Sequence, residues 1–213
     1  MPSGVVADWG GTNAVGLGLV GPKGCLGLLP YFGLKVTLQS AVAVTECTTV
    51  EIDDFALRDI CQRHPQMQSE LQALFHQQIA HAMSLAGCNA RHLVDQRLAR
   101  WLLTAADHLD DDRLRFTHNQ IAALIGVRRV TITLALQKLE GERAIRSNRG
   151  VVVIRDRSRL EACSCACYSQ RMFQAEAVGR QGDRPTLRSQ LWSAIIGAGY
   201  LLLDPVAQAL VLL

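Results

Sequence analysis

The sequence predicts an α+β protein with three parts: a partial antiparallel β-roll, a long dimerisation helix and a C-terminal winged helix-turn-helix domain. Short apolar runs between glycine turns occupy residues 4–52, and apolar residues spaced by three or four follow from Pro65. Two short helices that turn at Gly126 then precede a strand, a tight turn and a second strand. With 213 residues, 49% of them hydrophobic, the chain can bury a substantial core and is too apolar to be disordered.

The first half of the chain predicts strands and then a long helix. The runs at 41–44 and 48–52 have the composition of strands in an antiparallel sheet. From Pro65 to Cys88 the spacing predicts one amphipathic helix, whose apolar face is more than a short domain covers, so we expect it to pair with its copy in a homodimer or to pack on its own sheet. A second helix is expected over residues 92–108.

Residues 117–141 carry a helix-turn-helix pattern. Thr117 and Gln120 form a capping box at the start of a short helix, and Gly126 permits the positive φ of a sharp turn. A second helix is expected from about Arg128 to Gly141, with Ile132 facing inward. The strands on either side of the basic turn at 146–150 then predict a wing.

Charge along the chain indicates a polyanionic partner. The formal net charge is only +3, but residues 91–160 hold 14 basic and 8 acidic side chains, a balance of +6. Arginines at the start of the second helix suit guanine in the major groove, and hydroxyls and lysine suit phosphate. The alternative is a solvated charged helix in an ordinary bundle. The candidate DNA-binding residues are Thr117, His118, Arg128, Arg129, Val130, Thr131, Thr133, Leu134, Lys138, Arg146 and Arg149.

The chain resembles the Crp/Fnr family of bacterial transcriptional regulators, strongly over 92–168 and more weakly upstream. The likeness lies in residues 97–103, 116–133 and 149–157, and in 5–7, 21–27 and 44–57. It implies a shortened effector-type β-roll at 1–63, a dimerisation helix at 64–91, a winged helix-turn-helix DNA-binding domain at 92–162, and a cysteine cluster with an apolar tail at 163–213. It also implies a homodimer that reads a near-palindromic site on double-stranded DNA through the helix starting at Arg128, with RNA polymerase as a further candidate partner.

The resemblance assigns roles to single residues. Arg129 matches the family's base-reading arginine, and Arg128 and Thr131 match backbone contacts. Val130 and Leu134 stand where the family has an acidic and a basic reader, so we expect a different operator preference. Cys25 and Gln39 stand where cyclic-nucleotide-binding members have a glutamate and an arginine, and the chain begins where the family's roll is half built; we therefore expect no cyclic-nucleotide response and no cofactor.

Two other interpretations stay open. One is a truncated module that binds DNA but responds to no effector. The other is a sugar-kinase-like ATP-binding protein, because residues Asp8 to Thr12 resemble the first phosphate loop of that superfamily; a hairpin turn explains them better, and we expect no enzyme activity.

The remaining signals concern thiols, localisation and the tail. Cys163, Cys165 and Cys167 could hold zinc, hold part of an iron–sulfur cluster, or form a redox pair, but no fourth ligand is evident and reduced or structural thiols are the simpler interpretation. Seven cysteines and the lack of a basic residue before Lys23 favour the cytoplasm. Residues 191–213 are apolar, but Asp204 and Pro205 interrupt them, so we expect a packed tail rather than a membrane helix.

Overall fold

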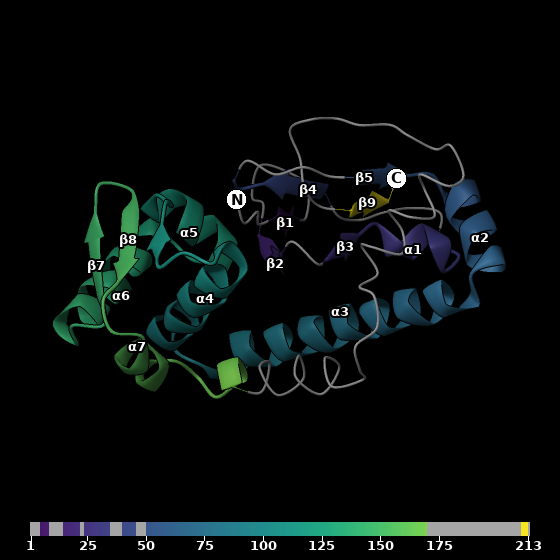
Figure 1. Cartoon of the computed structure of the whole chain (residues 1–213). Coiled ribbons are helices and arrows are strands. Elements are labelled where there is room, and N and C mark those ends of the chain that lie inside the picture. The colour runs from purple at the N-terminus through teal and green to yellow at the C-terminus, as the bar shows by residue number, and fades with distance from the viewer. Residues whose placement is uncertain are drawn as a thin grey trace.

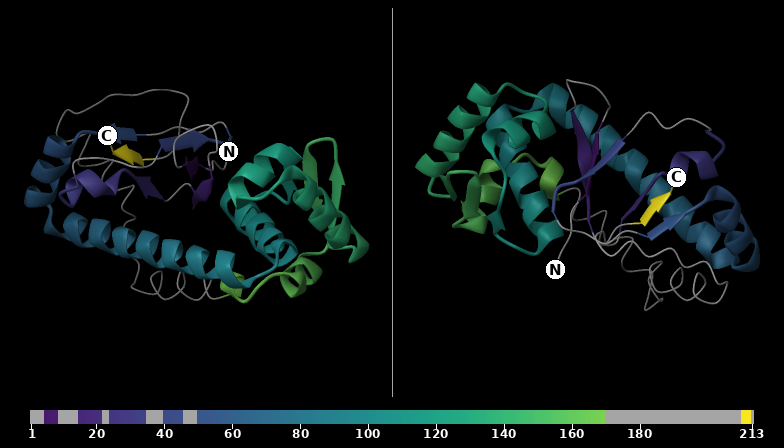
Figure 2. Two further views of the ribbon diagram at one scale, coloured as in Figure 1. Left: turned by 180° about the vertical axis from the view of Figure 1, so that it is seen from behind. Right: turned by 90° about the horizontal axis from the view of Figure 1, so that it is seen from above.

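A computed structural model of the chain describes residues 5–8, 15–21, 24–34, 40–45, 50–169 and 210–212. Figure 1 shows two parts joined by one long helix, α3 (Pro65–Arg91). Two small sheets lie along α3, and a compact group of helices with a third sheet follows its C-terminal end. The other two views show the same arrangement (Figure 2). The predicted α+β class is confirmed.

The N-terminal strands form two sheets, only one of which has the predicted antiparallel pairing. The antiparallel sheet has the order β2-β1-β4. The second sheet has the order β3-β9-β5 and is parallel, because residues 210–212 pair with both neighbours in the same direction. The elements are β1 (Val5–Asp8), β2 (Gly16–Val20), β3 (Cys25–Leu26), α1 (Leu28–Tyr31), β4 (Ser40–Ala43), β5 (Val50–Ile52) and β9 (Leu210–Leu212).

Residues 54–63, predicted as part of the β-roll, form the helix α2 (Asp54–Arg63). Asp53 caps it, since its carboxylate accepts a hydrogen bond from the backbone N–H of Ala56 at 2.9 Å. The inward side chains of α2 recur at helical spacing and pack with Met67 and Leu71 of α3 in the core of the N-terminal part.

Helix α3 begins at Pro65 as predicted and ends at Arg91, three residues beyond the predicted Cys88, but little of it is buried. Among its 27 residues only Met67, Leu71 and Cys88 are buried in this single chain. Further along, Ile79 and Met83 are exposed, although both are large and apolar. The C-terminal half of α3 therefore presents an apolar surface to its surroundings.

The C-terminal domain has a continuous core of its own. Helix α4 (Val94–Leu109) begins two residues later than predicted, and α5, α6, a three-stranded sheet and α7 pack around it. Strand β6 and helix α7 were missing from the prediction because each is short and lacks a strong pattern. The elements are β6 (Arg113–Leu114), α5 (His118–Ile125), α6 (Arg129–Gly141), β7 (Ile145–Asn148), β8 (Val151–Ile154) and α7 (Arg157–Cys163), with the sheet order β6-β8-β7.

Within the described residues, no helix has both the length and the apolar character needed to cross a membrane. Most of the apolar tail lies outside those residues, and so do positions 9–12 of the segment that resembles a phosphate loop.

Candidate nucleic-acid interface

The first helix of the motif, α5, begins with the predicted capping box. The backbone N–H of Gln120 donates to the hydroxyl of Thr117 at 3.3 Å, and the backbone N–H of Thr117 donates to the Gln120 side chain at 2.8 Å. These two bonds satisfy backbone donors that a helix start leaves open. The start of α5 is therefore fixed by its own sequence.

The turn between α5 and α6 uses a backbone conformation that glycine adopts most easily. Gly126 has φ of 74°, as the sequence predicts, and closes the end of α5. The buried guanidinium of Arg97 on α4 donates to the carbonyl of Ile125, the last residue of α5, at 2.5 Å. This contact places a positive charge at the negative end of the helix and ties the turn to α4.

Helix α6 starts at Arg129, with Arg128 as its N-cap, one residue later than predicted. Its inward face consists of Ile132, Ala135, Leu136 and Leu139, all buried. The opposite face holds Val130 and Leu134, which are 69% and 61% exposed. An isolated domain gains nothing from exposing two large apolar side chains, so this face has the properties of a binding surface.

His118 links both helices to the wing. Its Nδ1 lies 3.0 Å from the hydroxyl of Thr133, and its Nε2 lies 3.4 Å from the hydroxyl of Ser147 on β7. The Thr133 hydroxyl has one proton and donates it to the carbonyl of Arg129 at 3.2 Å. The Thr133 hydroxyl can therefore only accept from Nδ1 of His118.

The wing is a tight hairpin with basic residues near its tip. Asn148 pairs with Val151, and the two residues between them, Arg149 and Gly150, have φ of 40° and 80°. Positive φ at both central positions is the signature of a type I′ turn. The backbone N–H of Ser147 also donates to the carboxylate of Glu140 on α6 at 2.6 Å, which holds the wing against that helix.

Lys138, a predicted phosphate contact, is already paired within the chain. Its ammonium forms an ion pair with Asp95 near the start of α4. Burial raises the pKa of Asp95, but the hydrogen bond and charge of Lys138 more than offset this, so the pKa lies below its ordinary value of 3.8. The same contact raises the pKa of Lys138.

The structure gathers the predicted DNA-binding residues on α5, α6 and the wing. The exposed ones are Thr117, Arg128, Arg129, Val130, Leu134, Lys138, Arg146 and Arg149, whereas His118, Thr131 and Thr133 are half-buried.

The two positions compared with a cyclic-nucleotide site lie in the N-terminal part. Cys25, which stands in place of a ribose-binding glutamate, is buried in β3, and burial raises its pKa to about 12. Gln39 lies outside the described residues.

A second group of functional side chains lies where α3 meets the C-terminal domain. Cys165 and Cys167 are close to Cys88 and His92, whereas Cys163, the third predicted thiol, is not a member of this group. Cys88 and His92 are four residues apart at the end of α3. That spacing puts both on one helix face, and it is the signal in the sequence that could have identified them.

Comparisons with known proteins agree with this architecture. Residues 96–163 match the family model of the Crp-like helix-turn-helix domain. A CRP/FNR-family transcriptional regulator from Thermus thermophilus is similar in structure, with a TM-score of 0.61 and 22% identity over 79% of this chain and 84% of that one. FixK2 from Bradyrhizobium japonicum gives a TM-score of 0.56 at 16% identity over 76% and 84%.

The sequence matches none of the curated proteins with which it was compared. At these identities the structural likeness establishes the fold, and the family model identifies the domain. The chain therefore contains a Crp-like helix-turn-helix domain and has the fold of CRP/FNR-family transcriptional regulators.

Proposed function

We propose that the protein is a non-enzymatic transcription regulator that acts on DNA in the cytoplasm, with α6 in the major groove. The observation that carries the proposal is the outer face of α6. Arg129 stands exposed at its start, and Val130 and Leu134 follow on the same open side. In helix-turn-helix proteins the first residues of the second helix contact base edges. Arginine suits guanine, and an apolar side chain suits the methyl group of thymine.

Phosphate contacts come from the borders of this surface. Arg128 lies at the N-cap of α6, and Arg146 and Arg149 lie on the wing. All three are exposed and cationic, so they can follow the DNA backbone on either side of the groove. Thr131 and Thr133 are half-buried on α6. The hydroxyl of Thr131 adds a neutral donor, whereas that of Thr133 already donates to the carbonyl of Arg129.

We further propose that the protein acts as a homodimer through α3. Met83 is 71% exposed, Ile79 is also exposed, and Ala86 and Ala90 continue the same side of the helix toward its end. Two such helices can pack closely across small residues, and a two-fold axis would present two copies of α6 to a near-palindromic site. RNA polymerase is a further candidate partner of such a regulator. We expect a dimer by sedimentation analysis and a marked shift to monomer in Met83→Glu.

Selection from a random pool of double-stranded DNA tests the function. We expect an enriched near-palindromic site, to which Arg129→Ala binds about tenfold or more weakly, since one bidentate arginine–guanine contact contributes about 1–3 kcal/mol. The matched control is Arg159→Ala, which also removes one exposed arginine but lies on α7, where it pairs with Asp156. Equal losses in the two variants, or no enriched site, would reject the placement of α6.

A cyclic-nucleotide response is not expected from this chain. The buried thiol of Cys25 remains neutral because burial raises its pKa to about 12, and a thiol is a poor partner for ribose hydroxyls. Micromolar binding of a cyclic nucleotide in calorimetry would contradict this expectation.

A further inference from the structure

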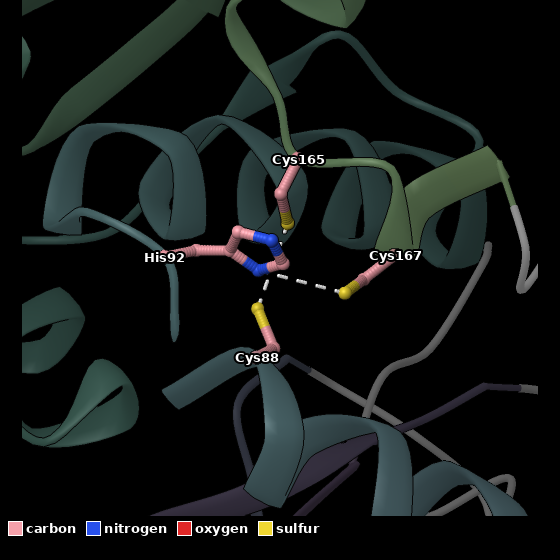
Figure 3. A group of neighbouring side chains, drawn as sticks. All are labelled: Cys88, His92, Cys165 and Cys167. Carbon is pink, nitrogen blue, oxygen red and sulfur yellow. Dashed lines mark hydrogen bonds between the residues drawn. The ribbon is translucent and has the colours of Figure 1, made fainter. Parts of the chain in front are cut away.

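Four potential metal ligands converge at the junction between α3 and the C-terminal domain. The sulfur of Cys88 lies 3.5 Å from the sulfur of Cys165, and the sulfur of Cys167 lies 3.6 Å from Nδ1 of His92. All four ligand atoms are within 4.8 Å of one another. Figure 3 shows the imidazole of His92 and the three sulfur atoms gathered around the same small space.

We propose that Cys88, His92, Cys165 and Cys167 bind one Zn²⁺ ion in a tetrahedral site of three thiolates and one imidazole. A zinc ion with Zn–S bonds of about 2.3 Å holds neighbouring ligand atoms about 3.8 Å apart in a tetrahedron. Two of the pairs here, at 3.5 and 3.6 Å, already have nearly this separation. Thiolate and imidazole ligands with this geometry are those that zinc prefers.

The geometry fits a single ion better than the alternatives. An iron–sulfur cluster places several iron and sulfide atoms between its protein ligands, which needs more room than ligand atoms within 4.8 Å leave. A disulfide would need the sulfurs of Cys88 and Cys165 about 2.05 Å apart, and it would leave His92 and Cys167 without a function. The ligands also form two short pairs, Cys88 with His92 and Cys165 with Cys167, from two distant segments.

Burial shows that this is an interior site and not a chance group of surface thiols. Cys88 and Cys165 are 1% and 4% exposed, and His92 and Cys167 are half-buried. A bound zinc ion would stabilise the thiolates and displace the three thiol protons.

Two buried arginines on α4 supply the charge that such a site requires. Zn²⁺ with three thiolates has a net charge of −1, which needs a nearby cation when it is buried. Arg97 and Arg100 are each only 9% exposed, and the Nε of each has no hydrogen-bond partner among the described residues. Arg97 interacts electrostatically with Cys88 and Cys165, and Arg100 does so with Cys167.

The site would join two segments that are far apart in the sequence. Cys88 belongs to the last turn of α3, His92 is the C-cap of that helix, and Cys165 and Cys167 follow α7. The hydroxyl of Tyr168 donates to Asp107 of α4 at 3.0 Å, which anchors the second pair of ligands to the C-terminal domain. A zinc ion would therefore fix the direction in which α3 enters that domain.

Metal analysis of the full chain, purified without chelators or added metal, tests the site directly. We expect one zinc per chain in the wild type, and a loss of most of it in Cys88→Ser and Cys165→Ser. Cys163→Ser is the matched control, because Cys163 is only two residues from Cys165 but lies outside the group. Zinc-free wild-type protein, iron in place of zinc, or equal zinc loss in Cys163→Ser would overturn the proposal.

Cobalt substitution keeps the test independent of the folding of the variants. Wild-type protein stripped of metal and titrated with Co²⁺ should show the intense visible bands and the thiolate charge-transfer absorption of a tetrahedral cobalt site, saturating at one equivalent. Absence of these bands would contradict the assignment, as would a Cys88–Cys165 disulfide detected by mass spectrometry in freshly purified protein. Neither measurement depends on DNA binding.

Discussion

Lys138 of α6 forms an ion pair with Asp95 of α4, so one cation of the proposed DNA-binding surface already has a partner when DNA is absent. The Lys138 side chain is more exposed than that of Asp95. A phosphate group would therefore compete with Asp95 for this ammonium. The pair also contributes little to stability, because exposed ion pairs are screened by solvent.

Asp95→Asn should increase the affinity for DNA. Loss of the carboxylate frees Lys138 and removes one negative charge beside the DNA, so we expect binding about two- to tenfold tighter at low salt. The slope of log affinity against log salt should steepen by about 0.9 for one additional phosphate contact. Unchanged affinity and slope would show that Lys138 does not reach the phosphates.

The effect of Asp95→Asn should be constant between about pH 5 and 8. Because the pKa of Asp95 in the folded protein lies below 3.8, the ion pair is present above that value and is lost only as the pH falls through the lowered pKa. Binding titrations at three pH values in this range provide the check.

Val130→Ala should change which DNA sequences are preferred without unfolding the protein. Its side chain is exposed, so truncation should change the free energy of unfolding by less than about 0.5 kcal/mol. If Val130 contacts a thymine methyl, the preference at that base pair should weaken by about fivefold or more. Ile132→Ala is the contrasting variant: Ile132 is fully buried on the same helix, and its loss should cost about 2–5 kcal/mol of stability.

Gly126→Ala should destabilise the domain by about 1–2 kcal/mol, the usual cost of a left-handed conformation for a residue with a side chain. Gly126 has φ of 74°, and an added Cβ would also lie 3.1 Å from a methyl carbon of Val15. Gly141→Ala is the matched control, because an added Cβ there meets nothing within 4 Å. Chemical denaturation of both variants would reveal the difference, and equal stabilities would contradict the strained turn.

The helix-turn-helix was predictable because its signals are local. Thr117 and Gln120 are three residues apart, and Gly126 ends the helix that they begin. Arg128 and Arg129 then follow at once, so the candidate surface could be named from the sequence alone. The wing was equally evident from its turn and its flanking strands.

Other features depend on contacts that no local pattern contains. Cys88 and Cys165 are 77 residues apart, and only the packing of the segment after α7 on α4 brings their sulfurs together. The partner of Lys138 lies 43 residues earlier, so an internal ion pair could not be foreseen. Helix α2 was missed for a different reason: its cap at Asp53 was not recognised next to the preceding strand-like residues.

Equilibrium binding to the selected DNA site, measured at several salt concentrations, tests the proposed function most directly. We expect strong preference for that site over a scrambled duplex of the same length, two chains per site, and a steep loss of affinity with salt. Each phosphate contact contributes about −0.9 to the slope of log affinity against log salt. Two chains would supply phosphate contacts from Arg128, Arg146 and Arg149, so we expect a slope of about −5 or steeper. Equal affinity for both duplexes, with a slope near zero, would contradict DNA recognition by this surface.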